Sequence, residues 1–121
     1  MFFTFWGLKL VQKGNLTGHS LFGRMLGLMN RGGAEAVGPS RLNFGGLGRW
    51  MFKRMMKARN VASLQEMRQM ASDLGVQLIA CQMSMEVMEI TRADLIPEVA
   101  EVAGVATFIE QMQGSQAALF I

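Results

Sequence analysis

The sequence predicts one α/β domain over residues 1–121, with a mostly parallel sheet that helices cover on both faces. Two observations carry this prediction. Half of the 121 residues are apolar and only 17% are charged, which is enough apolar material for one buried core. Along the chain, short apolar runs alternate with segments of helical periodicity, and this order is typical of parallel strands joined by helices.

The chain begins with an apolar, aromatic-rich run, Met1–Trp6, which predicts a buried strand. Because a central strand at the first residue has no lead-in, we expect the beginning of the fold to be missing. In the glycine-rich segment that follows, Ser20 is expected to cap a short helix ending at Leu28 or Met29. Residues 31–40 are expected to form a mobile loop.

Residues 47–58 predict a basic amphipathic helix, with apolar residues on one side and cations on the other. The apolar side holds Leu47, Met51, Phe52, Met55 and Met56, and the basic side holds Arg49, Lys53, Arg54 and Lys57, with Trp50 at the boundary. Such a helix packs against a sheet or a subunit interface, or lies on a membrane surface. We favour packing, because most stripes of this kind belong to a core.

The next helix has the clearest boundaries. Ser63 and Glu66 form a capping box at its start, and Gly75 provides a left-handed stop after Leu74. The run VQLIAC at residues 76–81 then predicts a strand that is buried on both sides.

Two short helical elements follow the buried strand. Ser84 is expected to cap a short helix that ends at Met88 or Glu89. Thr91 and Asp94 form a second capping box, before a helical turn limited by the following proline.

The last third of the chain predicts a strand, a helix and another strand. Residues 99–105 are expected to form a short strand and Thr107–Gln113 a helix. Gly114 and Ser115 break the helix, and the closing run QAALFI is expected to be a strand.

Charge and cysteine content limit the classes of function. The net charge is +3, but residues 1–60 carry +9 and residues 61–121 carry −6. Nucleic-acid binding is not expected, because no aromatic-studded basic motif is present. One cysteine and one histidine make a metal site improbable. A free thiol and the lack of a signal-peptide pattern favour the cytoplasm.

The single cysteine, Cys81, is predicted at the carboxyl end of a buried strand, just before a helix start. Backbone N–H groups and the positive helix end stabilise a thiolate at such a position, whereas Glu86 in the following turn opposes it. A dithiol mechanism needs a second cysteine, and a Cys–His protease needs an oriented base that His19 does not offer. Two interpretations stay open: a thiol that carries a sulfur atom, or an inert packed residue.

Several segments, in order over nearly the whole chain, resemble the DsrE/DsrF-like family. The likeness is strongest to its cytoplasmic branch, which carries the name peroxiredoxin and is linked to sulfur trafficking. The most specific motif is Cys81-Gln82-Met83-Ser84-Met85, with Met88 following. The other segments are MFFTFWGLKL, RWMFKRMMK, EVAGVATFIE and the closing ALFI.

The resemblance implies a flavodoxin-like layered fold, assembled as a trimer or hexamer, without a cofactor. It implies that Cys81 carries sulfur as a persulfide and passes it to a partner thiol, and that TusA-like or rhodanese-like sulfur carriers are the partners. Gln82, Met83, Ser84 and Met85 would line the site. Related chains have a strand–helix unit ahead of MFFTFWGLKL, which this sequence lacks. The alternative is an oligomeric or membrane-surface module that uses the basic helix 47–58.

Overall fold

The structure is a computed structural model that describes residues 1–29, 32–34, 36, 47–117 and 119. In these residues the chain forms a parallel three-stranded sheet, in the order β1 (Phe2–Phe3), β2 (Leu78–Cys81) and β3 (Val99–Ala103). The predicted α/β class with a parallel sheet is therefore confirmed, and the arrangement is consistent with a flavodoxin-like layered fold. The loop predicted at residues 31–40 lies largely outside the described residues.

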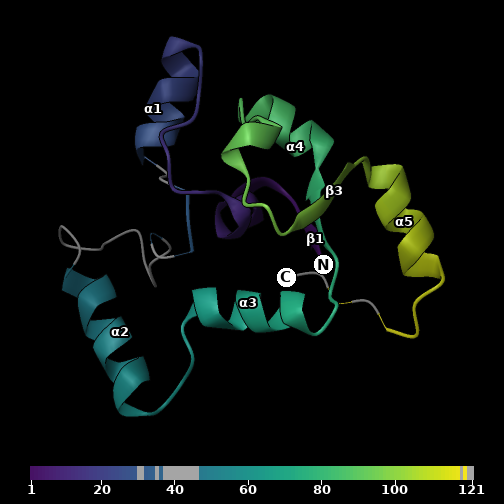
Figure 1. Cartoon of the computed structure of the whole chain (residues 1–121). Coiled ribbons are helices and arrows are strands. Elements are labelled where there is room, and N and C mark those ends of the chain that lie inside the picture. Colours follow the sequence, from purple (N-terminus) through teal and green to yellow (C-terminus); the bar gives the residue numbers. More distant parts are fainter. Residues whose placement is uncertain (30–31, 35, 37–46, 118, 120–121) are drawn as a thin grey trace.

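Helical segments surround the sheet (Figure 1). They are η1 (Phe5–Val11), α1 (Leu21–Met29), α2 (Leu47–Ala58), α3 (Leu64–Asp73), α4 (Gln82–Val87), η3 (Arg92–Asp94) and α5 (Val105–Gln113). None of the helices in the described ranges is long and apolar enough to cross a membrane.

The predicted first strand is much shorter than expected. Only Phe2 and Phe3 pair with β2, and the chain then enters the 3₁₀ helix η1. Phe5 has a φ of 40°, which turns the backbone out of the extended region. Leu8 and Val11 of η1 are fully buried, so this apolar segment enters the core as a helical turn.

Local capping signals are confirmed. The Ser63 side chain accepts a hydrogen bond from the Glu66 N–H, and the Glu66 carboxylate accepts one from the Ser63 N–H. Gly75 follows α3 with a φ of 82°. At the start of α1, Ser20 Oγ accepts a hydrogen bond from the Gly23 N–H. The capping box at Thr91 is also present.

The end of the chain departs from the prediction in detail. The third strand ends at Ala103, so α5 begins at Val105, two residues earlier than expected. In the predicted closing strand, residues 118, 120 and 121 lie outside the described residues. Gln116, Ala117 and Leu119 are in no strand.

The main apolar core lies on one face of the sheet. Its buried residues come from β2, β3, η1, α4 and the segments on either side of η3: Leu8, Val11, Leu78, Ala80, Met85, Ile90, Leu95, Ile96 and Val99. Since side chains alternate along a strand, Ile79 and Cys81 point to the opposite face. There the ring of Phe2, which pairs with Ile79, lies 5.1 Å from the ring of Phe108 in α5.

Candidate functional site

The single cysteine ends the central strand of the sheet. Cys81 is the last residue of β2 and pairs in parallel register with Ala103, the last residue of β3. All four residues of β2 are buried. The prediction that Cys81 lies at the carboxyl edge of a parallel sheet is therefore correct, and this is the edge at which open α/β sheets place their ligands.

Helix α4 starts immediately after this strand. Cys81 itself is the N-cap residue, and its side chain makes no capping hydrogen bond. The expectation that Ser84 caps this helix was wrong, because Ser84 lies inside the first turn and is fully buried. The helix begins earlier than predicted because the backbone turns directly from the strand end at Cys81 into Gln82.

A second helix starts beside the first. Ala103 leads through the N-cap residue Gly104 into α5, and again no side chain caps the helix. Because Cys81 and Ala103 are register partners, the first turns of α4 and α5 both lie at the carboxyl edge near Cys81. Backbone N–H groups in the first turn of a helix have no partner within that helix and favour negative charge.

The predicted site residues do not all share one environment. Gln82 is exposed, and its amide donates a 3.0 Å hydrogen bond to the Glu86 carboxylate. Met83 is 52% exposed, whereas Met85 is buried in the main core. Cys81 and Ser84 are therefore both buried, whereas Gln82 and Met83 lie at the surface.

The position of Glu86 decides how strongly its negative charge opposes a negative sulfur at Cys81. Its carboxylate is at the surface, where it accepts the hydrogen bond from Gln82, while Cys81 is buried. A solvated charge interacts weakly with a buried group, since water screens it. Glu86 consequently opposes a negative sulfur less than its place in the sequence indicated.

Ser84 contributes a buried hydroxyl that has no hydrogen-bond partner among the described residues. The side chain is fully buried, and its Oγ makes no hydrogen bond within the described part of the chain. A buried hydroxyl left unpaired destabilises a fold and calls for an explanation. Ser84 follows Cys81 by one helical turn, so its Oγ is a donor available to a group attached to the cysteine. Sequence reasoning missed this, although a serine one turn after a lone cysteine was the available signal.

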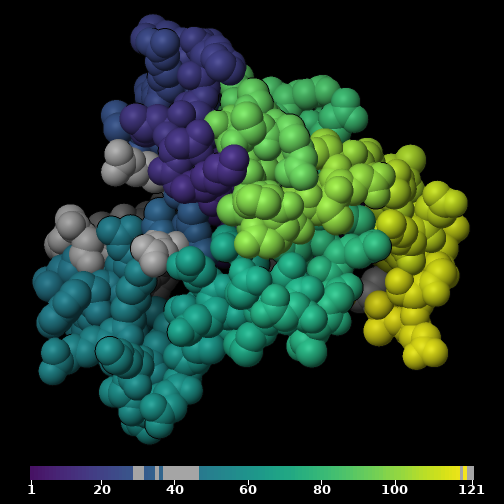
Figure 2. All heavy atoms as spheres, viewed as in Figure 1, coloured from purple at the N-terminus to yellow at the C-terminus, as the bar shows by residue number. Residues whose placement is uncertain are grey.

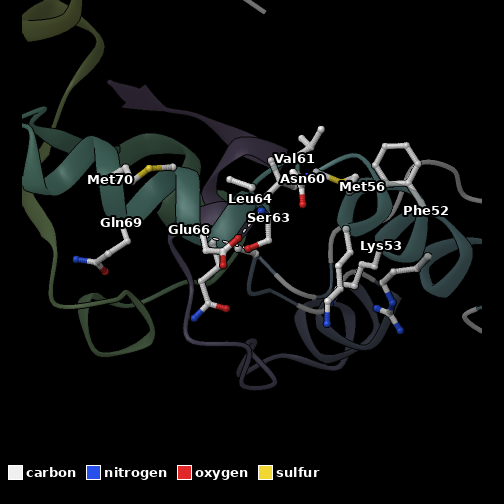
Figure 3. Close-up of a pocket in the computed structure, with 15 residues that line it drawn as sticks. Phe52, Lys53, Met56, Asn60, Val61, Ser63, Leu64, Glu66, Gln69 and Met70 are labelled. Carbon is white, nitrogen blue, oxygen red and sulfur yellow. Dashed lines mark hydrogen bonds between the residues drawn. The ribbon is translucent and has the colours of Figure 1, made fainter.

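A separate groove lies between α2 and α3 (Figure 3). It has a volume of about 950 Å³ and combines apolar side chains such as Phe52 and Met56 with the cations Lys53 and Lys57. No residue of the Cys81 segment is among the described residues that line it. The groove was not predicted, because the path of residues 59–63 between the two helices decides its shape.

A parallel sheet whose central strand ends in a lone cysteine, at the start of a helix, defines an α/β protein with a candidate thiol site. The chain belongs to the DsrE/DsrF/DrsH-like family, whose model matches residues 1–120. The predicted family is thereby confirmed, while its peroxiredoxin-named branch stays a prediction.

Two relatives match the whole chain. It is 34% identical, over 123 residues, to Uncharacterized protein YrkE of Bacillus subtilis and covers 76% of that protein. It is 32% identical, over 124 residues, to Sulfur carrier protein DsrE2 of Allochromatium vinosum and covers 77% of that protein.

Proposed function

We propose that this protein is a sulfur carrier that holds a persulfide on Cys81 and passes its outer sulfur to a thiol of a partner protein. The observation that carries the proposal is the place of Cys81 at the carboxyl end of β2, beside the uncapped starts of α4 and α5. Family membership and the name of the relative from Allochromatium vinosum support a role in sulfur relay.

The proposed loading step is a thiol exchange. The Cys81 thiolate attacks the outer sulfur of a donor persulfide, the donor's sulfur–sulfur bond breaks, and the donor leaves as a thiolate. Delivery is the same step in reverse, with an acceptor thiolate attacking the sulfur held on Cys81. No external oxidant or reductant is required. Since Cys81 is the only cysteine of the sequence, the proposed acceptor belongs to another protein.

The surroundings of Cys81 suit a negatively charged sulfur. The first-turn N–H groups of Met83 and Ser84 and those of α5 stabilise negative charge at the carboxyl edge. The buried Ser84 hydroxyl supplies a further donor, which has no partner among the described residues. Sulfur placed on Cys81 would give that hydroxyl an acceptor.

Burial sets a condition on transfer. Cys81 is only 1% exposed, so a donor or acceptor thiol reaches its sulfur only when the carboxyl edge opens. We therefore expect loading to be slower than the reaction of a free small thiol, and a partner protein to accelerate it by docking at this edge. TusA-like and rhodanese-like carriers are the proposed partners, and a trimer or hexamer in the cytoplasm is the proposed form.

Intact mass after incubation with glutathione persulfide tests the proposal. Wild-type protein is expected to gain one sulfur atom, which a reductant then removes, and Cys81→Ser is expected to gain none. Val87→Gln is a matched control at an exposed position of α4 outside the predicted site, and it is expected to load as the wild type does. Equal gain in Cys81→Ser, or no gain in the wild type, would falsify the proposal.

A further inference from the structure

An apolar ridge on α2 is exposed and lies outside the groove that α2 shares with α3. Leu47, Met51 and Met55 recur every four residues, so they form one line along the helix. Each is more than half exposed, and none lines the groove that faces α3. The other apolar side chains of α2, Phe52 and Met56, do line that groove. The ridge is therefore the outer face of α2.

All charged residues of α2 are cations. The helix contains Arg49, Lys53, Arg54 and Lys57 and no acidic residue, and Arg59 follows its end. Trp50 lies at the border of the ridge and is exposed, with the Arg54 guanidinium 5.8 Å from its ring centroid. Tryptophan has an apolar body and a polar N–H, a combination that is favoured at the boundary between lipid and water.

Helix α1 also exposes several large apolar side chains. Its two glycines, Gly23 and Gly27, are buried, and a Cβ on Gly27 would lie 2.3 Å from the Thr17 carbonyl oxygen. The helix thus packs on the protein through its glycines, while Leu21 is 90% exposed and Phe22 and Leu28 are also exposed. Figures 1 and 2 show α1 and α2 on the side of the molecule away from α5.

Charge decides which partner fits this surface. A second copy that packed α2 against α2 would bring the cations of both helices together, which is unfavourable. A nucleic acid would pair with the cations but leave the ridge exposed. An anionic bilayer satisfies both features, because apolar side chains enter the boundary of headgroups and acyl chains while cations attract the headgroups.

We propose that α2, with support from α1, attaches the protein to the surface of an anionic membrane. The ridge of Leu47, Met51 and Met55 enters the boundary region, and Trp50 lies at headgroup level. The cations of α2 remain in water near the lipid phosphates. This surface is distinct from the Cys81 edge, so a carrier would keep its thiol site while bound.

Vesicle co-sedimentation tests this inference. The wild-type protein is expected to bind vesicles of phosphatidylcholine with phosphatidylserine, to bind pure phosphatidylcholine much less, and to lose binding as salt is raised. Met51→Gln with Met55→Gln keeps the helix propensity but removes the ridge and is expected to abolish binding. Lys53→Gln with Lys57→Gln is expected to weaken binding about fivefold for each charge removed.

Three controls separate membrane binding from misfolding and from sulfur transfer. Leu74→Gln changes an apolar residue that is even more exposed than the ridge but lies outside it, and this variant is expected to bind as the wild type does. Cys81→Ser is also expected to bind normally, so failure of the sulfur proposal leaves this one standing. Circular dichroism checks that each variant is folded.

Two results would overturn the inference. One is wild-type protein that stays in solution with phosphatidylserine vesicles at low salt. The other is a folded ridge variant that binds vesicles as tightly as the wild type. If gel filtration instead shows that the ridge substitutions dissociate an oligomer while vesicles bind neither protein, the ridge is an interface between copies and the membrane proposal is wrong.

Discussion

At the scale of single residues, Cys81 and Ser84 are two buried side chains about one helical turn apart in the sequence. The thiol is an N-cap without a capping bond, and the hydroxyl one turn later has no partner among the described residues. Ordinary packing does not require a hydroxyl at residue 84, because an alanine would fill most of the same space without an unpaired polar group. Replacing this hydroxyl therefore distinguishes an effect on stability from an effect on the proposed persulfide chemistry.

The first prediction concerns Ser84→Ala. Removing an unpaired buried hydroxyl is expected to leave the free energy of unfolding unchanged or to raise it by up to about 1 kcal/mol. The same variant is expected to retain less persulfide on Cys81, because the donor is lost. Denaturant unfolding and intact mass measure the two effects.

A matched serine provides the control. Ser63→Ala removes a hydroxyl that accepts the Glu66 N–H at the start of α3, and is expected to cost about 1 kcal/mol of stability without affecting persulfide loading. A loss of more than about 1 kcal/mol in Ser84→Ala would show that its hydroxyl has a structural partner, contrary to the role inferred for it.

The sequence predicted the place of some residues of this site correctly and that of others wrongly. The apolar run before Cys81 predicted that this residue ends a strand, because a strand that is buried on both faces consists of consecutive apolar residues. The prediction that Ser84 caps the helix was wrong. Serine is common at helix starts, but the end of the preceding strand decides where this helix begins. The surface contact between Gln82 and Glu86 was also beyond sequence reasoning, since it depends on which way α4 faces.

At the scale of elements, α1 shows how small residues orient a helix. Its glycine face packs closely on the backbone at Thr17 and on the Glu89 side chain, which leaves the large apolar residues outside. The sequence predicted the helix and its cap at Ser20 but did not say which face packs. The close approach at Gly23 and Gly27 decides that the glycine face is buried.

The second prediction follows from this packing. A methyl group on Gly27 would overlap a backbone carbonyl that cannot rotate away, so Gly27→Ala is expected to lower stability by about 1–3 kcal/mol or to detach α1. Hydrogen exchange of the α1 amides and denaturant unfolding distinguish these results. Gly104→Ala is the control, because a Cβ there meets no atom within 4 Å. Equal behaviour of the two variants would refute the packing argument.

At the scale of the whole molecule, two carboxylates tie distant segments together. Glu89 accepts hydrogen bonds from the His19 N–H at 2.5 Å and the Ser20 N–H at 2.8 Å, and also from the Ser20 hydroxyl. Asp94 accepts hydrogen bonds from Thr91 and from the Asn15 side chain. These bonds join the first thirty residues to the segment after α4.

The same bonds shift the acidity of these groups. Hydrogen bonds from the Ser20 side chain and backbone lower the pKa of Glu89 below its ordinary 4.5. Burial raises the pKa of Asp94, but the hydrogen bonds from Thr91 and Asn15 outweigh it, so the pKa is lowered below 3.8. The backbone N–H of Ser63 lowers the pKa of Glu66 in the same way.

The third prediction is a loss of stability in acid. Because each of these pKa values is lower in the folded protein than in the unfolded chain, the unfolded chain binds more protons as the pH falls. The stability they contribute is present above the ordinary pKa of about 4.5 and is lost as the pH falls through the lowered values. Denaturant unfolding from pH 7 to pH 3 measures this decline.

Glu89→Gln tests the link between Glu89 and the segment at His19 and Ser20. The variant is expected to be less stable than the wild type at neutral pH and to show a shallower decline in acid. Glu110→Gln, on the exposed face of α5, is expected to follow the wild-type curve. Parallel curves for Glu89→Gln and the wild type would rule out Glu89 as a source of the pH dependence.

The sequence by itself determined the α/β class, the capping boxes at Ser63 and Thr91, and the place of Cys81 at a strand end. These features depend on neighbouring residues, through periodicity, capping and burial of consecutive positions. Only the tertiary structure decided that Cys81 is buried, that the Ser84 hydroxyl has no partner among the described residues, and that the ridge on α2 is exposed. Those features depend on contacts between segments far apart in the chain, which no local pattern encodes.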